Sequence, residues 1–370
     1  MARGMFSALD GRPSATRATW VDLMRGTAIV LVVVFHVVTV TEAYSGHTFT
    51  RLTGFLETVQ GLRMPLLFFL SGLLVPRSLR KGSARYINGK VRLIAYPYVI
   101  WSLIMVALLA IGGYFLAWDV SPLTSLLRIV YDPIEHLWFL AYLFLFYVIA
   151  LLVSKTHAFV PVACSLVLYA IPMDGQWEVF WRFAVFFFVG VLAGRIPAAM
   201  DRMSGSFALN VLAVVSVGVL TALPVLGVPV RLPAAPWNVV VAFWFFVGLA
   251  GLVRMCQRAP ILAPLAYVGR QSIVFYLAHW PIVLFSVRML ADGTGMSAWS
   301  IVTTSLAVTA AGTTALAFAS ERVPAVRLLF EWPPRGTPAS RPERVETAVA
   351  EGRPTGQRAN NDQASPGGDS

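Results

Sequence analysis

Long apolar runs separated by short polar segments dominate the sequence. Ten of these runs approach the length of about 20 mostly apolar residues that a helix needs to cross a bilayer. They cover approximately residues 20–41, 55–75, 92–116, 136–153, 158–173, 178–196, 207–227, 237–254, 266–289 and 298–320. A backbone in lipid must satisfy its own hydrogen bonds, so a spanning segment is a helix or a barrel strand. Because these runs are too long for barrel strands, the pattern predicts an all-α polytopic membrane protein with about ten transmembrane helices.

The composition supports this fold class and excludes others. The 370 residues are 57% hydrophobic and 13% charged, whereas a soluble domain has about 45–50% and about 25%. A soluble globular enzyme and a disordered scaffold are therefore excluded. The formal net charge of +11 does not predict a nucleic-acid partner, because the bases lie in short loops between apolar runs. Cys164 and Cys256 show neither a disulfide framework nor metal-ligand spacing, and we expect no metal.

Basic residues concentrate in alternate loops, and this predicts the orientation. The loop after the second run carries a cluster with no acid between its members, namely Arg77, Arg80, Lys81, Arg85, Lys90 and Arg92. The positive-inside rule places this loop, and with an even number of crossings both termini, in the cytoplasm. We expect a cytoplasmic N-terminal segment over 1–19 and a transmembrane domain over 20–323. A disordered cytoplasmic tail is expected over 324–370, where polar residues dominate and apolar periodicity stops.

Ionisable residues inside the runs are the first candidates for function, because a charge in a membrane helix is costly. In the first run, Arg25 and His36 are eleven residues apart. That separation is three helical turns and about 20° of rotation, so both residues lie on one face, roughly 16 Å apart along the axis. The plainer interpretation is that Arg25 is an interface anchor and that His36 bonds to a neighbouring carbonyl.

The second and ninth runs carry similar groups. Arg63 lies too deep in the second run to reach the surface easily, so a functional role or a buried ion pair with Glu57 would explain it equally well. In the ninth run, Ser272, Tyr276 and His279 recur at i, i+4 and i+7 and share one face. The plainer interpretation of His279 is a packed histidine with satisfied hydrogen bonds.

The fourth and sixth runs begin with residues typical of a membrane interface. His136 and Trp138 open the fourth run, and Arg182 lies near the start of the sixth. Together with the buried groups above, they predict a polar layer from mid-membrane outward, in which a histidine could act as general base toward a hydroxyl. The basic cytoplasmic layer suits the phosphates of an anionic donor, although binding of anionic lipid explains it equally well.

In this order, the residues resemble motifs of the acyltransferase-3 family of membrane O-acyltransferases. The similar segments are Arg25 with His36, Pro65-Leu-Leu-Phe-Phe-Leu-Ser71-Gly72, Arg77-Ser-Leu-Arg80, His136-Leu-Trp138, Gly269-Arg-Gln-Ser272 with Tyr276-Leu-Ala-His279-Trp280-Pro281, and Glu321-Arg322-Val-Pro324. The resemblance covers about residues 18–330. Each motif alone is loose, but their order along ten predicted helices is specific.

Two departures from the family pattern affect what the resemblance implies. Many members have an aspartate in the second helix close to the Phe-Phe pair, where this sequence has Pro65, which we also expect to interrupt the helix. An acid that supports His36 would therefore be Glu57 or Glu135. Some members carry a soluble esterase-like domain after the last helix, whereas the segment here has the composition of a disordered tail.

The resemblance implies transfer of an acyl group, with acetyl expected first, from cytoplasmic acyl-CoA to a hydroxyl group. The acceptor would contain a sugar, as an envelope glycan, a glycolipid or a glycosylated metabolite does. Acyl-CoA would be a co-substrate and not a tightly bound cofactor. The protein would be a multi-pass protein of a bacterial cytoplasmic membrane, in contact with its lipids, and Arg25, Arg77 and Arg80 would bind the donor's phosphates.

The same hypothesis assigns roles at the reacting centre. His36 would accept the proton of the attacking hydroxyl, and Tyr276, His279 or Arg63 would stabilise the oxyanion. Direct transfer and an acyl-histidine intermediate both stay open. The residues expected to bind the acceptor are Glu57, His136, Trp138 and Arg182.

A transporter or exporter of a glycan or lipid is the alternative, since buried arginine and histidine also suit a substrate pathway. Transporters often contain two matching halves with Gly- or Pro-broken helices. Pro65 has no clear counterpart in a second half of this sequence, which favours the enzyme.

Overall fold

The computed structural model describes residues 19–116, 122–228, 238–257, 259–293 and 295–333, and within these ranges it contains helices and no strand. The longer helices are α1 (Thr19–Ser45), α2 (Thr50–Leu73), α5 (Tyr96–Leu116), α6 (Pro122–Tyr131), α7 (Trp138–Leu152), α8 (Phe159–Ala170), α9 (Gln176–Arg195), α11 (Phe207–Val225), α12 (Asn238–Cys256), α14 (Ser272–Gly293) and α15 (Ala298–Arg322). The shorter ones are α3 (Val75–Leu79), α4 (Ser83–Lys90), the π-helix η2 (Val91–Ala95), the 3₁₀ turns η3 (Glu135–Leu137) and η4 (Pro260–Leu262), α10 (Pro197–Gly205), α13 (Ala263–Arg270) and α16 (Pro324–Arg327).

The all-α polytopic class predicted from the sequence is confirmed. Among the described residues, nine helical segments are long and apolar enough to cross a membrane, and they correspond to nine of the ten predicted runs. The remaining run, 158–173, forms α8, whose 12 residues extend only about 18 Å. That length is well short of a bilayer core of roughly 30 Å.

Two local predictions were wrong. The run predicted over 266–289 is divided into α13 and α14, because Gln271 leaves the helical conformation at φ −96° and ψ 22°. Pro65, by contrast, does not interrupt α2, which continues through it. A proline removes one backbone donor, and the helix tolerates this loss because most of the residues around Pro65 are buried against neighbouring helices.

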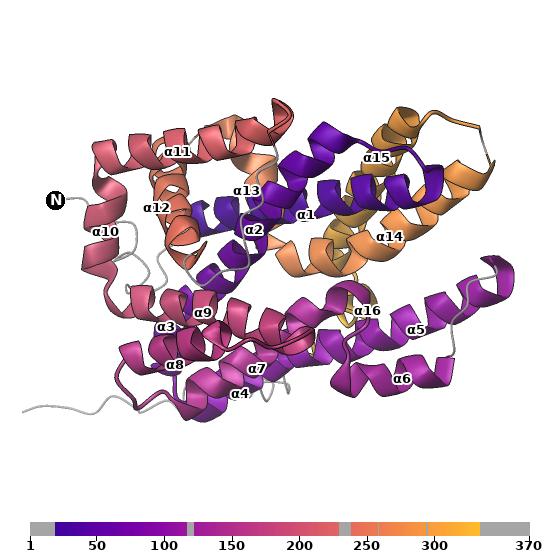
Figure 1. Cartoon of the computed structure of the whole chain (residues 1–370). Coiled ribbons are helices and arrows are strands. Elements are labelled where there is room, and N and C mark those ends of the chain that lie inside the picture. Colours follow the sequence, from indigo (N-terminus) through magenta and orange to yellow (C-terminus); the bar gives the residue numbers. More distant parts are fainter. Residues whose placement is uncertain (1–18, 117–121, 229–237, 258, 294, 334–370) are drawn as a thin grey trace, which may run out of the picture. The chain divides into compact units, whose positions relative to one another are not determined.

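Helices α1 and α2 occupy the centre of the described helices, with α11 and α12 on one side and α14 and α15 on another (Figure 1). They approach their neighbours at glycines. In α1, a Cβ atom added at Gly26 would collide with the carbonyl oxygen of Leu265 in α13, and one added at Gly269 of α13 would collide with that of Asp22. Small residues allow such close backbone contact between membrane helices.

The contact between α2 and α9 has the same construction. A Cβ atom at Gly72 of α2 would collide with the carbonyl oxygen of Phe187, and one at Gly190 of α9 would collide with that of Phe69. These reciprocal contacts fix how closely α2 lies against α9, and Arg63 is carried on the same α2.

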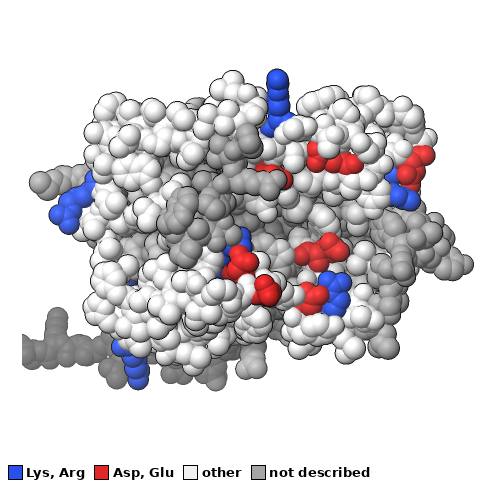
Figure 2. All heavy atoms as spheres, in the orientation of Figure 1, with Lys and Arg blue, Asp and Glu red and all other residues white. Residues whose placement is uncertain are grey.

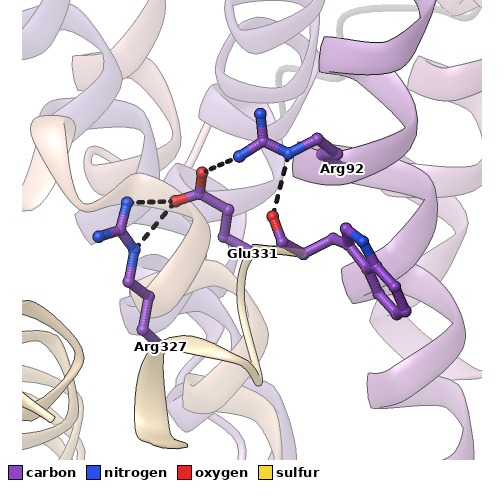
Figure 3. Close-up of polar contacts among 4 residues, drawn as sticks. Arg92, Arg327 and Glu331 are labelled. Atoms are coloured by element: carbon purple, nitrogen blue, oxygen red, sulfur yellow. Dashed lines mark hydrogen bonds and ion pairs between the residues drawn. The ribbon is translucent and has the colours of Figure 1, made fainter. Parts of the chain in front are cut away.

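The ordered chain continues beyond the predicted start of the tail at 324. Helix α16 and the residues up to Trp332 pack against η2 and α5, because the carboxylate of Glu331 bridges Arg92 at 2.8 Å and Arg327 at 2.9 Å (Figure 3). Arg92 Nε also donates to the carbonyl of Trp332 at 3.0 Å. The predicted boundary therefore lies too early. The rest of the predicted tail, 334–370, and residues 1–18 of the predicted N-terminal segment lie outside the described residues.

The surface has the character expected of a protein that contacts lipid. Many large apolar side chains are exposed, among them Leu152, Val215 and Phe318. Figure 2 shows a face formed mostly by uncharged residues, with acidic side chains gathered toward its centre and right. In that view, the C-terminal ends of α1, α5 and α14 lie on the right side.

We predict that Gly190→Ala lowers the thermal stability of the protein. The new methyl group meets backbone and not a movable side chain, so α2 and α9 must separate, and overpacking of this kind costs about 1–3 kcal/mol. Thermal unfolding of the purified protein in detergent measures the effect. Gly218→Ala in α11 is the matched control, since no atom lies within 4 Å of its added Cβ. Equal midpoints for the two variants would contradict the assigned helix contact.

Candidate active site

Three imidazole rings from three separate segments meet inside the helices. His279 of α14 lies between the other two, with its ring centroid 5.3 Å from that of His36 in α1 and 5.3 Å from that of His136 in η3. His279 is 0% exposed and His136 is 4% exposed, whereas His36 is half-buried. The structure thus brings together three predicted site residues, of which only His36 is partly exposed.

The hydrogen bonds of His279 define its protonation. Its Nδ1 lies 2.7 Å from the carbonyl oxygen of Tyr276 and 3.2 Å from that of Phe275. Because a carbonyl oxygen only accepts, the hydrogen is on Nδ1, and the Nε2 of the neutral ring is an acceptor. This Nε2 is buried and has no partner among the described residues. Nε2 therefore lies on the edge of the His279 ring that faces away from the backbone of α14.

His136 is held by two hydrogen bonds that run in opposite directions between η3 and α14. Its Nε2 donates to the carbonyl oxygen of Leu277 at 3.2 Å, and the hydroxyl of Tyr276 donates to the backbone carbonyl of His136. The chain enters η3 through Glu135, which has a φ of 48°, a left-handed conformation uncommon outside glycine. The Nδ1 of His136 is buried and has no partner in the described structure.

Arg63 supplies a positive charge beside these rings. It is 3% exposed, its guanidinium carbon lies 4.0 Å from the centroid of Phe35, and it acts electrostatically on both His36 and His279. Its one hydrogen bond to the residues that the structure describes, from Nη1 to the carbonyl of Leu31, is 3.4 Å long. Within the described chain no carboxylate pairs with Arg63, and Glu57 is exposed, so the ion pair considered from the sequence is not formed.

An uncompensated cation in an apolar interior is costly. The tertiary structure nevertheless holds the guanidinium of Arg63 in place, with its Nε buried and without a partner in the described residues. Such a group is available to an anion or to an oxygen that gains negative charge. The cluster thus combines acceptor nitrogens with a cation.

The comparison with protein families agrees with this chemistry. The family model for the acyltransferase-3 domain, described as "Acyltransferase domain", matches residues 18–319. The chain belongs to the acyltransferase-3 family. Comparison with curated proteins and with solved structures found no match. The family membership makes the protein a membrane acyltransferase, and the matched range includes all three histidines and Arg63.

Trp280 lies beside the imidazoles but was not among the predicted site residues. Its ring lies 4.7 Å from His36 and 6.0 Å from His136 between centroids, and its buried Nε1 has no partner among the described residues. The position directly after His279 was the available signal. Helical spacing alone gave no reason to separate it from other interfacial tryptophans.

Other predicted residues lie apart from the imidazoles. Trp138 stacks on Phe183 with centroids 5.2 Å apart, and Arg182 pairs with Glu178 one helical turn away. Neither has a ring contact or hydrogen bond to the three histidines. The hydroxyl hydrogen of Tyr276 is engaged by the His136 carbonyl, so Tyr276 holds η3 in place and its hydrogen is not directed at a substrate.

The predicted donor-binding arginines fall into two places. Arg77 and Arg80 lie on and directly after α3, which packs mainly against α9. Arg25 lies on α1, which packs mainly against α13. Arg77 is half-buried and Arg80 is exposed. Within the described part of the chain, no group of three or more His, Cys, Asp or Glu side chains is arranged to hold a metal ion.

We predict that Tyr276→Phe reduces both thermal stability and acyl transfer. The variant keeps the ring but leaves the buried carbonyl of His136 without its donor, which costs about 1–3 kcal/mol, and it frees one end of η3. Tyr98→Phe is the control, because the Tyr98 hydroxyl donates in the same way to the Ile129 carbonyl at 2.5 Å, away from the cluster. Thermal unfolding and transfer rates are measured for both variants. A loss of activity as large in Tyr98→Phe would show that Tyr276 has no special effect on the site.

Proposed function

We propose that the protein transfers an acyl group, with acetyl first, from cytoplasmic acyl-CoA to a hydroxyl of a sugar-containing acceptor. The observation that carries this proposal is the convergence of three imidazoles on an unpaired, buried arginine in a membrane acyltransferase. Neutral imidazole suits removal of a proton from a hydroxyl, and the guanidinium suits a carbonyl oxygen that becomes negative. The setting we propose is a bacterial cytoplasmic membrane, with the basic loop that carries Arg77 and Arg80 on its cytoplasmic side.

The proposed reaction takes place at His36. Its imidazole accepts the proton of the acceptor hydroxyl while that oxygen attacks the thioester carbonyl carbon. The carbonyl oxygen becomes an oxyanion, which Arg63 stabilises. The carbon–sulfur bond then breaks, the ester is released, and the proton on His36 passes to the departing thiolate of CoA. An acyl-histidine intermediate would use the same residues with two successive attacks.

The donor would be held from the cytoplasmic side. Arg25 lies on the same α1 as His36, roughly 16 Å away along the helix axis, so one helix connects the basic layer with the reacting centre. Arg77 and Arg80 would bind phosphates by charge-assisted hydrogen bonds, and the thioester arm would extend to His36. Acyl-CoA is thus a co-substrate in this proposal.

The acceptor would enter from the opposite end of the helices. Glu57, Trp138 and Arg182 are carried by α2, α7 and α9, and aromatic rings with a few charged groups suit the faces and hydroxyls of a sugar. Among them, exposed Glu57 remains open to a ligand, whereas Trp138 and Arg182 would act through the aromatic and ionic contacts that they already make.

We predict that His36→Ala abolishes release of CoA from acetyl-CoA in the presence of acceptor, without lowering the amount of protein in the membrane. The reason is loss of the general base, a contribution of typically 10²–10⁴-fold. The matched control is His157→Ala, since His157 is exposed and lies in a loop. Mass spectrometry of glycans and glycolipids from cells carrying either variant identifies the acceptor. Full transfer by His36→Ala would refute the mechanism, and a glycan that changes compartment without acylation would support a transporter.

Arg77→Ala is expected to raise the acyl-CoA concentration needed for half-maximal rate and to leave the acceptor requirement nearly unchanged. Loss of one charge-assisted hydrogen bond to a phosphate would weaken donor binding by roughly tenfold. Lys155→Ala is the control, because Lys155 is an exposed base in another loop that is predicted to be cytoplasmic. Steady-state kinetics with each substrate varied separately gives the answer. An unchanged acyl-CoA requirement would mean that Arg77 does not bind the donor and that the basic segment only sets the orientation of the protein in the membrane.

A further inference from the structure

Four buried polar atoms around His36 have no partner among the described residues. Two are nitrogens with a fixed role as acceptors, Nε2 of His279 and Nδ1 of His136, because the other nitrogen of each neutral ring donates to a backbone carbonyl. The other two are donors, Nε1 of Trp280 and Nε of Arg63. Buried polar groups are normally hydrogen-bonded, so this concentration at one place indicates groups kept for a ligand.

The number and kind of these atoms restrict the ligand. A hydroxyl group donates one hydrogen and accepts through its lone pairs. One hydroxyl therefore satisfies one imidazole and leaves the other acceptor unpaired, whereas two neighbouring hydroxyls satisfy both imidazoles and both donors. A carboxylate or phosphate has no hydrogen for either ring, and the described residues offer no metal-binding arrangement.

We propose that the cluster binds two adjacent hydroxyl groups, so that the acceptor is a vicinal diol, and that His136 and Trp280 recognise the hydroxyl next to the one that is acylated. This inference rests on the proposed function. In the bound acceptor, the reacting hydroxyl donates its hydrogen to Nε2 of His279 and its oxygen accepts from Arg63. His36, whose ring centroid lies 5.3 Å from that of His279, takes that proton when the oxygen attacks. The neighbouring hydroxyl donates to Nδ1 of His136 and accepts from Nε1 of Trp280.

The rigidity of His136 is what makes it selective. Its Nε2 donates to the Leu277 carbonyl, and its backbone carbonyl accepts from the Tyr276 hydroxyl. Neither the ring nor the η3 turn is therefore free to move toward a ligand that lacks the second hydroxyl. A site with a fixed, desolvated acceptor discriminates against a ligand that lacks the matching donor, because the acceptor is then left unpaired.

The test compares 1,2-cyclohexanediol, as separate cis and trans isomers, with cyclohexanol as acceptors, and follows release of CoA from acetyl-CoA by the full-length protein in detergent. We expect the wild type to use one diol isomer with a kcat/KM about 10- to 100-fold higher than that for cyclohexanol. In His136→Gln the side-chain amide still donates to the Leu277 carbonyl, but its oxygen is bonded one atom further along the side chain than Nδ1, so the acceptor is displaced from the second hydroxyl. The preference for the diol over cyclohexanol should then fall to about twofold, the statistical factor for two hydroxyls.

Trp280→Phe is the second variant, because it keeps an aromatic ring beside His36 and removes the Nε1 donor together with part of the indole. It should also reduce the preference for the diol. His47→Gln changes an exposed histidine outside the cluster and should retain the full preference. Equal use of diol and cyclohexanol by the wild type, or a preference that survives in both His136→Gln and Trp280→Phe, would overturn the diol site while leaving the acyltransferase intact.

Binding without turnover separates this inference from the proposed reaction. If no acceptor releases CoA, the proposed function fails, and the thermal unfolding midpoint with 1,2-cyclohexanediol or cyclohexanol at equal concentration still tests the site. A larger rise with the diol in the wild type and in His47→Gln, but not in His136→Gln, supports recognition of two hydroxyls. The same rise with both alcohols overturns it.

Discussion

The backbone carbonyls of one turn of α14 hold both buried imidazoles. Those of Phe275 and Tyr276 receive the Nδ1 hydrogen of His279, and that of Leu277 receives the Nε2 hydrogen of His136. Backbone carbonyls cannot donate, so they fix the tautomer of each ring as well as its place. Everything proposed for the site depends on this, because it leaves one acceptor nitrogen on each ring.

Packing of the helices supplies the other half of the site. Helix α1 carries His36 and α2 carries Arg63, and both helices are pressed against their neighbours at glycines, where no side chain separates the backbones. Rigid placement of Arg63 matters, because a buried cation without a paired carboxylate has no compensating contact if the groups around it are free to move away. The same close packing explains how α2 tolerates Pro65, since the surrounding helices bury the backbone of α2 around the proline and hold it in a helical conformation.

Sequence reasoning succeeded where one helix contains the whole pattern. The apolar runs predicted the spans, and helical geometry placed Arg25 and His36 on one face without any tertiary information. It was insufficient where separate segments meet. His136 and Trp138 both looked interfacial, yet one joins the imidazoles while the other stacks on Phe183. The end of the domain was also misjudged, because the bridge of Glu331 between two arginines depends on contacts distant in sequence.

The three histidines differ in access, and this difference has a chemical consequence. A group that exchanges protons with a substrate must be reached by it, and half-buried His36 meets that requirement. Groups that define the shape and polarity of a site work best when they are desolvated and held, as His136 and His279 are. If His36 were as tightly bound as the other two, it would lose the freedom to pass its proton from the hydroxyl to the thiolate. The absence of a fixing hydrogen bond at His36 within the described structure is therefore consistent with the role of general base that we propose for it, and the carbonyls of α14 hold the other two rings in place.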